Sequence, residues 1–537
     1  MPSWKRIRLQ TAEDLEQSFD LITSYIHRPS LASTVEELSF DRIRNYIRFD
    51  DPSNPPPLCG GGRTTDYSAM VSLRLNSPLS PSEVLLNRSV HALPMPDSQK
   101  QRVSTAILWK SQNRAPDPTD RREVSNYVYY RHDEHYEYAS AVFVLLCLLA
   151  PNLQQISTIP PADLPSEFLR AANRGKLAQG SSVLSKLSRV KIFTSTHRHI
   201  VNDPRFYHRT PVLSSFRHFD RFPNLKSLST QAIEPWEDDD LSTIPPGLST
   251  VKNISVTNSG MDSEFMGTLI RMPAELESIT LTTGGRSVER GHTFIQYPKT
   301  LGKCLEQQRE TLKYIDLDFD QYLRAYKFEP PEVEAELGAE PRYDHFDDSD
   351  KQDELEEDAQ ADLDLVADKA ESLRRGHVLH SRDLPNTKSY GLTIGSFRDF
   401  HGLKVLRIGI KALLGPVYYR RDLPSGEIKT NAEGEKEVMK TWNLGLADML
   451  PGGLEELAVR GYKTGENALW DKEVDNLKQV IREGGFPYLR TVKGLDGGNG
   501  GHEEGSVGSG EDVNDPDNNE DDLTVVEEEQ GWVEAES

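Results

Sequence analysis

The sequence has few cysteines and no long apolar run. Among its 537 residues the three cysteines, Cys59, Cys147 and Cys304, lie far apart and form no Cys-x-x-Cys pair. Neither a disulfide framework nor a zinc site of that type is therefore expected. The longest apolar stretch, residues 139–150, has twelve residues, whereas a membrane helix needs ~20. No apolar run follows the basic residues of the N-terminus, which argues against a secretory signal. These absences predict a protein of the cytoplasm, the nucleus or both, without a membrane partner.

Motifs that indicate an enzyme are also missing. The glycines at 60–62 lack the Gly-Lys-Ser/Thr ending of a phosphate-binding loop, and a serine between glycines occurs only at 505–510, in an acidic segment. His132 and His135 are spaced i, i+3, whereas a zinc-binding His-Glu-x-x-His pair needs i, i+4. We therefore predict a protein that is not an enzyme, with no catalytic residue, no cofactor and no metal site.

Charge is unevenly distributed along the chain. The total is −23, but residues 332–371 hold 17 acidic and 3 basic residues, and residues 496–537 hold 15 acidic and none basic. The rest of the chain carries about +6. Dense like charge with little apolar content does not offset the entropy of an ordered chain, so both acidic segments are predicted to be disordered.

A recurring strand cassette is the main feature that is present. Each copy has a Pro or Gly break and then a pattern close to Leu-x-x-Leu-x-Leu. The copies occupy residues 150–156, 222–228, 248–256, 272–281, 311–317, 400–408, 450–459 and 486–492. Their spacing is irregular: Leu225 and Leu248 are 23 residues apart, but Leu276 and Leu312 are 36 apart. One strand-helix unit cannot bury its apolar face alone. The fold class is therefore predicted as α/β, an irregular leucine-rich-repeat-like solenoid with a parallel sheet on its concave side.

Strand side chains alternate between two faces, so side chains between the leucines should face away from the core. The apolar residues on the other face should form one buried row: Leu228, Ile254, Ile279, Ile315, Leu406 and Leu457. Along the stack these outward residues change from hydroxyl-bearing to charged and aromatic. This surface suits a protein or peptide partner better than a small molecule. The candidate partner-binding residues are Tyr314, Asp316, Arg407, Ser229, Ser255 and Thr280. Tyr314, Asp316 and Arg407 are expected to contribute most, because aromatic and Arg side chains dominate interface energetics.

A basic stretch offers a second hypothesis. Residues 186–226 hold nine basic and two acidic residues, and Phe206, Tyr207, Phe216, Phe219 and Phe222 lie among them. Such interleaving could form a platform for single-stranded nucleic acid. The alternative is a pair of repeats whose aromatic residues belong to the core and whose charges face solvent. No nucleic-acid-binding motif accompanies the stretch, so we favour the alternative and do not expect a nucleic-acid partner.

The chain divides into three predicted parts. Residues 1–150 form an N-terminal cap or first repeat with long loops and a long helix, residues 151–494 form the degenerate solenoid, and residues 495–537 form the acidic tail. Within the cap we expect the strands 4–9 and 35–40 and the helices 13–27, 99–112 and 124–149. The stretch 77–119 is otherwise expected to be irregular, and 415–440 is expected to be rich in turns.

Residues 4–40 resemble a known family. The strand Trp4 to Leu9, a helix, and then the stretch Tyr25-Ile26-His27-Arg28-Pro29-Ser30-Leu31-Ala32-Ser33-Thr34-Val35-Glu36-Glu37-Leu38-Ser39-Phe40 resemble a signature of filamentous-fungal F-box/leucine-rich-repeat proteins. The Phe-Pro-Asn-Leu and Leu-Pro-x-x-Leu openings of later repeats are similar to the same family. The resemblance covers residues 4 to about 494.

This resemblance implies a protein-binding function. In that family the repeats bind a substrate, and an F-box before them docks on the adaptor of a cullin-type ubiquitin ligase. No F-box precedes Trp4 in this sequence, and Leu164-Pro165-Ser166-Glu167-Phe168-Leu169, which is similar to an F-box opening, lies among the repeats. We therefore expect a non-catalytic protein-binding module. A ubiquitin-ligase substrate receptor, which would also bind the cullin-ligase adaptor, is the alternative if an upstream F-box exists. An enzyme or a nucleic-acid binder is a remote third.

Overall fold

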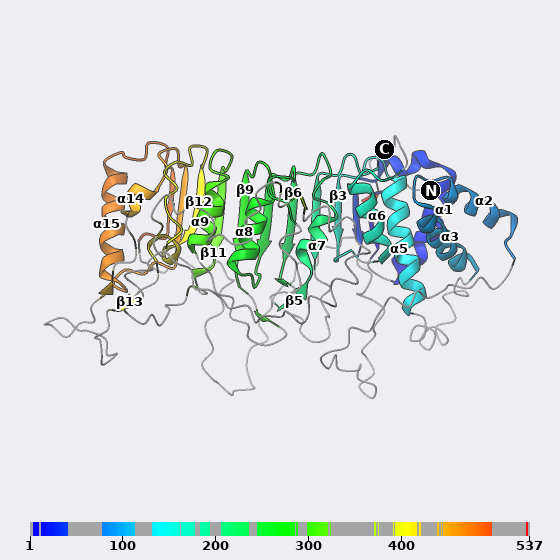
Figure 1. Ribbon diagram of the computed structural model, residues 1–537, viewed down its shortest axis with the longest axis horizontal. Helices are drawn as coiled ribbons and strands as arrows, with labels where there is room; N and C mark the ends of the chain where they lie inside the picture. The colour runs from blue at the N-terminus through cyan, green and yellow to red at the C-terminus, as the bar shows by residue number, and fades with distance from the viewer. Residues whose placement is uncertain are drawn as a thin grey trace, which may run out of the picture. The chain divides into compact units, whose positions relative to one another are not determined.

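The computed structural model has a mixed α/β architecture built mainly from parallel strands (Figure 1). It describes residues 4–9, 12–40, 78–112, 132–161, 163–177, 183–193, 206–235, 244–284, 286–287, 298–320, 323, 370–371, 374, 390, 393–415, 418–419, 438–439, 442, 444–496 and 533–534. Two compact units are present. The first comprises Met1–Pro204, Ser215–Leu225 and Gly505–Ser537, and the second comprises Arg205–Ser214 and Lys226–Glu504.

The first unit combines a parallel sheet with a group of helices. Its parallel strands follow the order β1, β2, β3, β4, and a short strand, β17, pairs antiparallel with β1. The strands are β1 (Trp4–Leu9), β2 (Glu37–Phe40), β3 (Gln155–Thr158), β4 (Arg189–Phe193) and β17 (Val533–Glu534). The helices are α1 (Ala12–His27), the 3-10 helix η1 (Pro29–Thr34), α2 (Pro81–His91), α3 (Asp97–Gln112), α5 (His132–Leu149) and α6 (Asp163–Asn173).

Helix α5 supplies the core of the helical part. Nearly every side chain from Tyr138 to Ala150 is buried, so the longest apolar run of the sequence belongs to a core helix. Polar contacts fix its neighbours. The buried Lys110 of α3 forms an ion pair with Glu16 of α1, and its ammonium lies 5.5 Å from the ring centroid of Tyr138. A buried lysine is retained only when it is paired in this way.

The second unit contains seven parallel strands in the order β6, β8, β9, β11, β12, β15, β16. They are β6 (Ser227–Gln231), β8 (Asn253–Thr257), β9 (Ser278–Thr282), β11 (Tyr314–Asp318), β12 (Val405–Gly409), β15 (Glu456–Arg460) and β16 (Thr491–Lys493). A smaller parallel sheet has the order β10 (Arg286–Ser287), β5 (Phe206–Thr210), β7 (Ile233–Pro235). The sheet is open, because β16 is an end strand of the order.

The predicted apolar row of the second unit is confirmed. Its members face one another in register across six strands and are at most 1% exposed. They are Leu228, Ile254, Ile279, Ile315, Leu406 and Leu457. Alternation of side chains places this row on one face of the sheet and the polar residues on the other.

Helices cover the apolar face of this sheet. Helices α8 (Ser263–Arg271) and α9 (Pro298–Glu306) pack on each other and lie over the strands (Figure 1). Gly267 of α8 allows this approach, because a Cβ there would lie 3.0 Å from Sγ of Cys304 on α9. The later helices of the unit are α13 (Ile410–Leu414), α14 (Leu446–Met449) and α15 (Ala468–Arg482). Helix α7 (Val212–Arg217) contains residues of both units.

Several predicted elements differ from the structure. Helix α5 begins at His132, and residues 124–131 of the predicted helix lie outside the described residues. Strand β2 is shorter than predicted: η1 ends at Thr34, Val35 and Glu36 connect it to the strand, and the strand itself is Glu37–Phe40. The described part of the stretch 77–119, residues 78–112, contains two helices instead of one. Helix α2 begins with a capping box, in which Ser80 and Glu83 bond each other's backbone N–H groups. That Ser-x-x-Glu pattern is a known helix start signal, so α2 was predictable.

The acidic segments lie almost entirely outside the described residues. Of the predicted insert 332–371 the structure describes residues 370 and 371, and of the predicted tail 495–537 it describes 495, 496 and strand β17. The turn-rich stretch 415–440 includes two short antiparallel strands, β13 (Tyr418–Tyr419) and β14 (Val438–Met439). Within the described residues, no helix combines the length and apolarity required to cross a bilayer.

Candidate binding surface

The polar face of the second unit's sheet carries all six predicted binding residues. The outward positions form rows in register along the sheet, separated by the buried apolar rows. One row contains Ser229, Ser255, Thr280, Asp316, Arg407, Ala458 and Lys493. A second contains Ser227, Asn253, Ser278, Tyr314, Val405, Glu456 and Thr491. We call this surface the outward face.

The two halves of the outward face differ in chemistry. Strands β6, β8 and β9 present hydroxyl and amide groups, and Ser229, Ser255 and Thr280 are each partly exposed in one row. Small hydroxyl side chains contribute little to binding energy on their own. This half therefore offers a flat, uncharged polar surface with adaptable hydrogen bonds.

Strands β11, β12 and β15 carry a connected ionic network. Arg407 Nε donates to Glu456 Oε1 at 2.9 Å, and its Nη1 lies 3.7 Å from Asp316 Oδ2. The Arg407 guanidinium also lies 5.6 Å from the ring centroid of Tyr314, and the Tyr314 hydroxyl donates to Asp316 Oδ2 at 3.2 Å. Three of the predicted residues, Tyr314, Asp316 and Arg407, are thus in mutual contact.

Arg460 completes the network and was missed by sequence reasoning. Its Nη1 donates to Asp316 Oδ1 at 2.6 Å and to the carbonyl oxygen of Leu317 at 3.4 Å, and its Nε lies 3.9 Å from Asp318 Oδ2. Arg460 is the third outward position of β15, after Glu456 and Ala458. Extending the period-two alternation by one step would have found it.

Asp316 lies inside this network and not on its surface. Its side chain is 8% exposed and lies between Arg407 and Arg460. A carboxylate that accepts hydrogen bonds from two neighbouring groups holds them in fixed positions. We therefore assign Asp316 a positioning role, and the half-buried Tyr314, Arg407 and Arg460 are the side chains of the network that a partner can reach.

Burial changes the acid-base properties of the carboxylates after Asp316. Burial raises the pKa of Asp318 above its ordinary value, and Arg460 partly opposes the shift. Burial also raises the pKa of Asp320 to about 6, although the backbone N–H groups of Lys411 and Ala412 donate to its carboxylate at 2.9 and 3.2 Å. Gly409 makes room for this carboxylate, because a Cβ at 409 would overlap it. Asp320 therefore ties the end of β11 to the first turn of α13.

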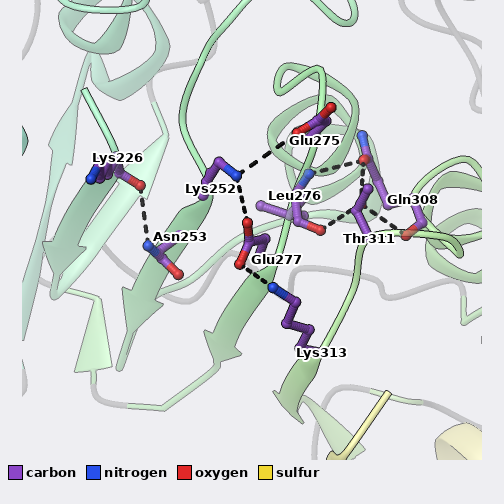
Figure 2. Close-up of polar contacts among 9 residues, drawn as sticks. All are labelled: Lys226, Lys252, Asn253, Glu275, Leu276, Glu277, Gln308, Thr311 and Lys313. Carbon is purple, nitrogen blue, oxygen red and sulfur yellow. Dashed lines mark hydrogen bonds and ion pairs between the residues drawn. The ribbon is translucent and has the colours of Figure 1, made fainter. Parts of the chain in front are cut away.

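A second charged row lies immediately before the strands. Figure 2 shows Glu277, the residue before β9, between Lys252 before β8 and Lys313 before β11. Its two carboxylate oxygens accept from these lysines at 2.5 and 2.6 Å. Hydrogen bonds from both lysines hold the pKa of Glu277 at about 2, well below its ordinary value. Opposite charges in register on adjacent strands favour this pairing over a shifted one.

The side chain of Gln308 forms hydrogen bonds with backbone groups of the loop beside this row (Figure 2). Its Oε1 accepts from the N–H of Leu276 at 3.1 Å, and its Nε2 donates to the carbonyl oxygens of Ile270 and Pro273 at 3.2 and 3.0 Å. Thr311 donates to the carbonyl oxygen of Leu276 at 2.8 Å. These contacts satisfy buried backbone groups where the chain turns into β9. They position the strand and take no part in the outward face.

The basic, aromatic stretch does not provide a stacking surface in its described part. Phe216, Phe219 and Phe222 are buried in the core, and His218 is buried as well. Phe193, the last residue of β4, is partly exposed, and the side chains of Phe206 and Tyr207 lie outside the described residues. The structure therefore agrees with the core interpretation for Phe216, Phe219 and Phe222.

Other residues considered from the sequence have structural positions. In the F-box-like segment, which forms part of α6, Leu164, Phe168 and Leu169 are fully buried. The Ser166 hydroxyl oxygen lies 2.6 Å from Nε2 of the buried His218, next to this packed surface, and links α6 to residues 215–218. Cys147 and Cys304 are buried and form no disulfide. Among the described residues, no group of three His, Cys, Asp or Glu side chains could hold a metal ion.

Comparison with known proteins adds no relative. No protein-family model matches the chain, and a search of the curated proteins finds none that is similar to it. The case for a function therefore depends on the outward face itself.

Proposed function

We propose that the outward face of the second unit is a protein-binding surface and that the protein is a non-catalytic binding module. In this proposal the repeats form an irregular leucine-rich-repeat-like solenoid whose parallel sheet is the concave side. The observation that carries the proposal is the network of Tyr314, Asp316, Arg407, Glu456 and Arg460 on a sheet face that presents polar side chains over seven strands.

The network has properties expected of an interaction hot spot. Tyr and Arg are the residue types that most often dominate binding energy. Arg407 and Arg460 are held by charge-assisted hydrogen bonds before any partner arrives, which lowers the entropy cost of binding. The adjoining hydroxyl-bearing strands supply contact area without strong charge. A protein surface of mixed charge and polarity matches such a face better than a small ligand does.

The F-box resemblance favours one specific version of this function. Residues 4–40 form the order that the resemblance implies, with α1 ending at His27, η1 covering the Pro29–Thr34 stretch, and β2 beginning at Glu37. This supports, as a second candidate, a substrate receptor of a cullin-type ubiquitin ligase. The F-box-like residues of α6 are buried, so they cannot contact an adaptor while α6 is folded. A receptor would need an F-box outside residues 163–173.

Affinity capture with matched variants tests the main proposal. The tagged full-length chain and the variants Tyr314→Ala and Ser255→Ala would be incubated with lysate, and bound proteins would be quantified by mass spectrometry. We expect Tyr314→Ala to lose specific partners and Ser255→Ala to keep them, with equal melting temperatures for both. A separate binding assay with a purified cullin-ligase adaptor distinguishes a receptor from a plain binding module. Partners lost equally in both variants would contradict the proposed site.

A further inference from the structure

The apolar row of the second unit reaches the surface at its last strand. The six members of this row on β6 to β15 are at most 1% exposed. Val492 on β16 is in register with Leu457 and therefore occupies the seventh position of the same row, yet it is 39% exposed. Tyr488, just before β16, is 62% exposed. Among the described members of this row on β6 to β16, Val492 is thus the one whose side chain is exposed, and it lies on the last strand.

Strand β16 also has an open edge. It pairs with β15 on one side, and no other strand in the described part of the chain pairs with it. An edge strand presents unpaired backbone N–H and C=O groups, which are a template for another extended chain. The exposed Val492 and the open edge belong to the same strand. An added strand would therefore cover the Val492 side chain and also pair with the unpaired backbone groups of β16.

Charge at this edge argues against a second copy of the protein. Arg490, the residue before β16, and Lys493, the last residue of β16, are both exposed. If two copies of β16 paired antiparallel about Val492, Lys493 of each copy would lie opposite Thr491 and beside Arg490 of the other. The two Arg490 and two Lys493 side chains would then place four positive charges on one short pair of strands that carries no acidic residue at 490–493, and their mutual repulsion opposes pairing. Exposed lysines are a common protection of edge strands against self-association.

We propose that the open edge of β16 is a strand-addition site for an extended acidic segment of a partner protein. A β-branched or aromatic residue of that segment would pack against Val492 and Tyr488. Acidic residues beside it would face Lys493 and Arg490, and its backbone would pair with the free edge of β16. Lys493 is the last member of one row of the outward face, but the site shares no residue with the Tyr314 network and does not depend on the function proposed for that network.

Fluorescence anisotropy on the full-length chain tests the proposal. The probe is a labelled peptide of sequence Asp-Glu-Val-Thr-Val-Thr-Glu-Asp, and the control peptide has lysine in place of every acidic residue. We expect saturable binding of the acidic peptide at low salt and binding of the control at least about tenfold weaker. Lys493→Glu should weaken the acidic peptide about tenfold and strengthen the lysine peptide. Val492→Gln should weaken both.

Two further variants make the test specific. Lys226→Glu makes the same charge change at an exposed site before β6, the strand of this unit that is farthest from β16 in the sheet order, and should leave the affinity unchanged. Tyr314→Ala should also leave it unchanged, which separates this edge from the Tyr314 network. Circular dichroism melts check that each variant is folded. Absence of saturable binding, equal affinity for both peptides, or equal losses in Lys226→Glu and Lys493→Glu would overturn the proposal. The proposal would also be overturned if the protein bound no peptide but formed a dimer that Val492→Gln dissociates, because the edge would then bind a second copy.

Discussion

Replacing Ile279 by Ala should cause a large, localised loss of stability. Ile279 is fully buried on β9, in register with Ile254 on β8 and Ile315 on β11. Truncation of a buried Ile to Ala costs about 2 to 5 kcal/mol, and the cost rises with the cavity that remains. The ladders to β8 and β11 hold both neighbours in place, so the cavity can collapse little. We therefore expect about 4 kcal/mol, a large part of the ~5 to 15 kcal/mol that stabilises a typical domain.

Thr280→Ala is the matched control, because Thr280 follows Ile279 in the same strand and faces outward. It loses a β-branched side chain from a strand, which costs at most about 1 kcal/mol. Ile279→Val gives an intermediate step, with an expected loss of about 0.5 to 1.5 kcal/mol. The loss of stability in the three variants should therefore depend on which face of the sheet the side chain occupies and on the volume that is removed. It should not depend on the position in the chain.

Hydrogen exchange measured by mass spectrometry is the suitable assay, since the chain has two compact units and one global transition cannot be assumed. In Ile279→Ala, protection should fall in β8, β9 and β11 and remain unchanged in β2 and β3 of the first unit. Urea unfolding provides the corresponding free energies. If Thr280→Ala lost as much protection as Ile279→Ala, the assignment of the buried row would be refuted.

Three further predictions concern the charged groups and one glycine. Glu277→Gln should remove a pH-dependent part of stability: the lowered pKa of Glu277 stabilises the fold above about pH 4.5, and this contribution is lost as pH falls toward 2, so the difference from wild type in urea midpoints should shrink over that range. The contribution of Asp320 to stability changes with pH in the opposite direction, because its pKa is raised to about 6. Stability that is present below about pH 4 is lost as pH rises through 6, and Asp320→Asn, which does not ionise, should show a flatter profile between these values. Gly409→Ala should cost about 1 to 3 kcal/mol in urea unfolding because its Cβ overlaps the Asp320 carboxylate, and no measurable loss would contradict that packing.

The parallel sheet of the second unit was predictable because its determinants are local. Each strand repeats an apolar, polar, apolar order after a Pro or Gly break, and period-two alternation fixes which side chains enter the core. For this reason Leu228, Ile254 and Leu457 were correctly assigned to one buried row although they are up to 229 residues apart. The start of α2 was equally local, since Ser80 and Glu83 form a capping box, and it was missed only because the surrounding prolines suggested a loop.

Contacts between residues that lie far apart in the sequence were less predictable. Asn152 and Asn224 each lie at the second position of a Pro-Asn-Leu opening, and each donates its side-chain amide to a backbone carbonyl of the preceding repeat, that of Ser33 and Ser185 respectively. Regular leucine-rich repeats place an asparagine after the third apolar position, and nearly all the cassettes of this chain lack it. The chain instead places a linking amide before the strand, where Pro-Asn-Leu is visible in the sequence but its partner is not.

In the charged half of the outward face, the sequence predicted which side chains share a face of the sheet. It did not predict which of these side chains contact one another. Alternation placed Tyr314, Asp316 and Arg407 on one face, but the role of Asp316 depends on Arg460, which is 144 residues away in the chain. Sequence spacing across irregular repeats does not specify which strand becomes the neighbour of another. Once β12 and β15 are adjacent, Asp316 lies between two guanidinium groups and is nearly buried. An acidic residue that looked like a direct contact therefore becomes the residue that holds two arginines in place, and those arginines, with Tyr314, are the groups a partner would meet.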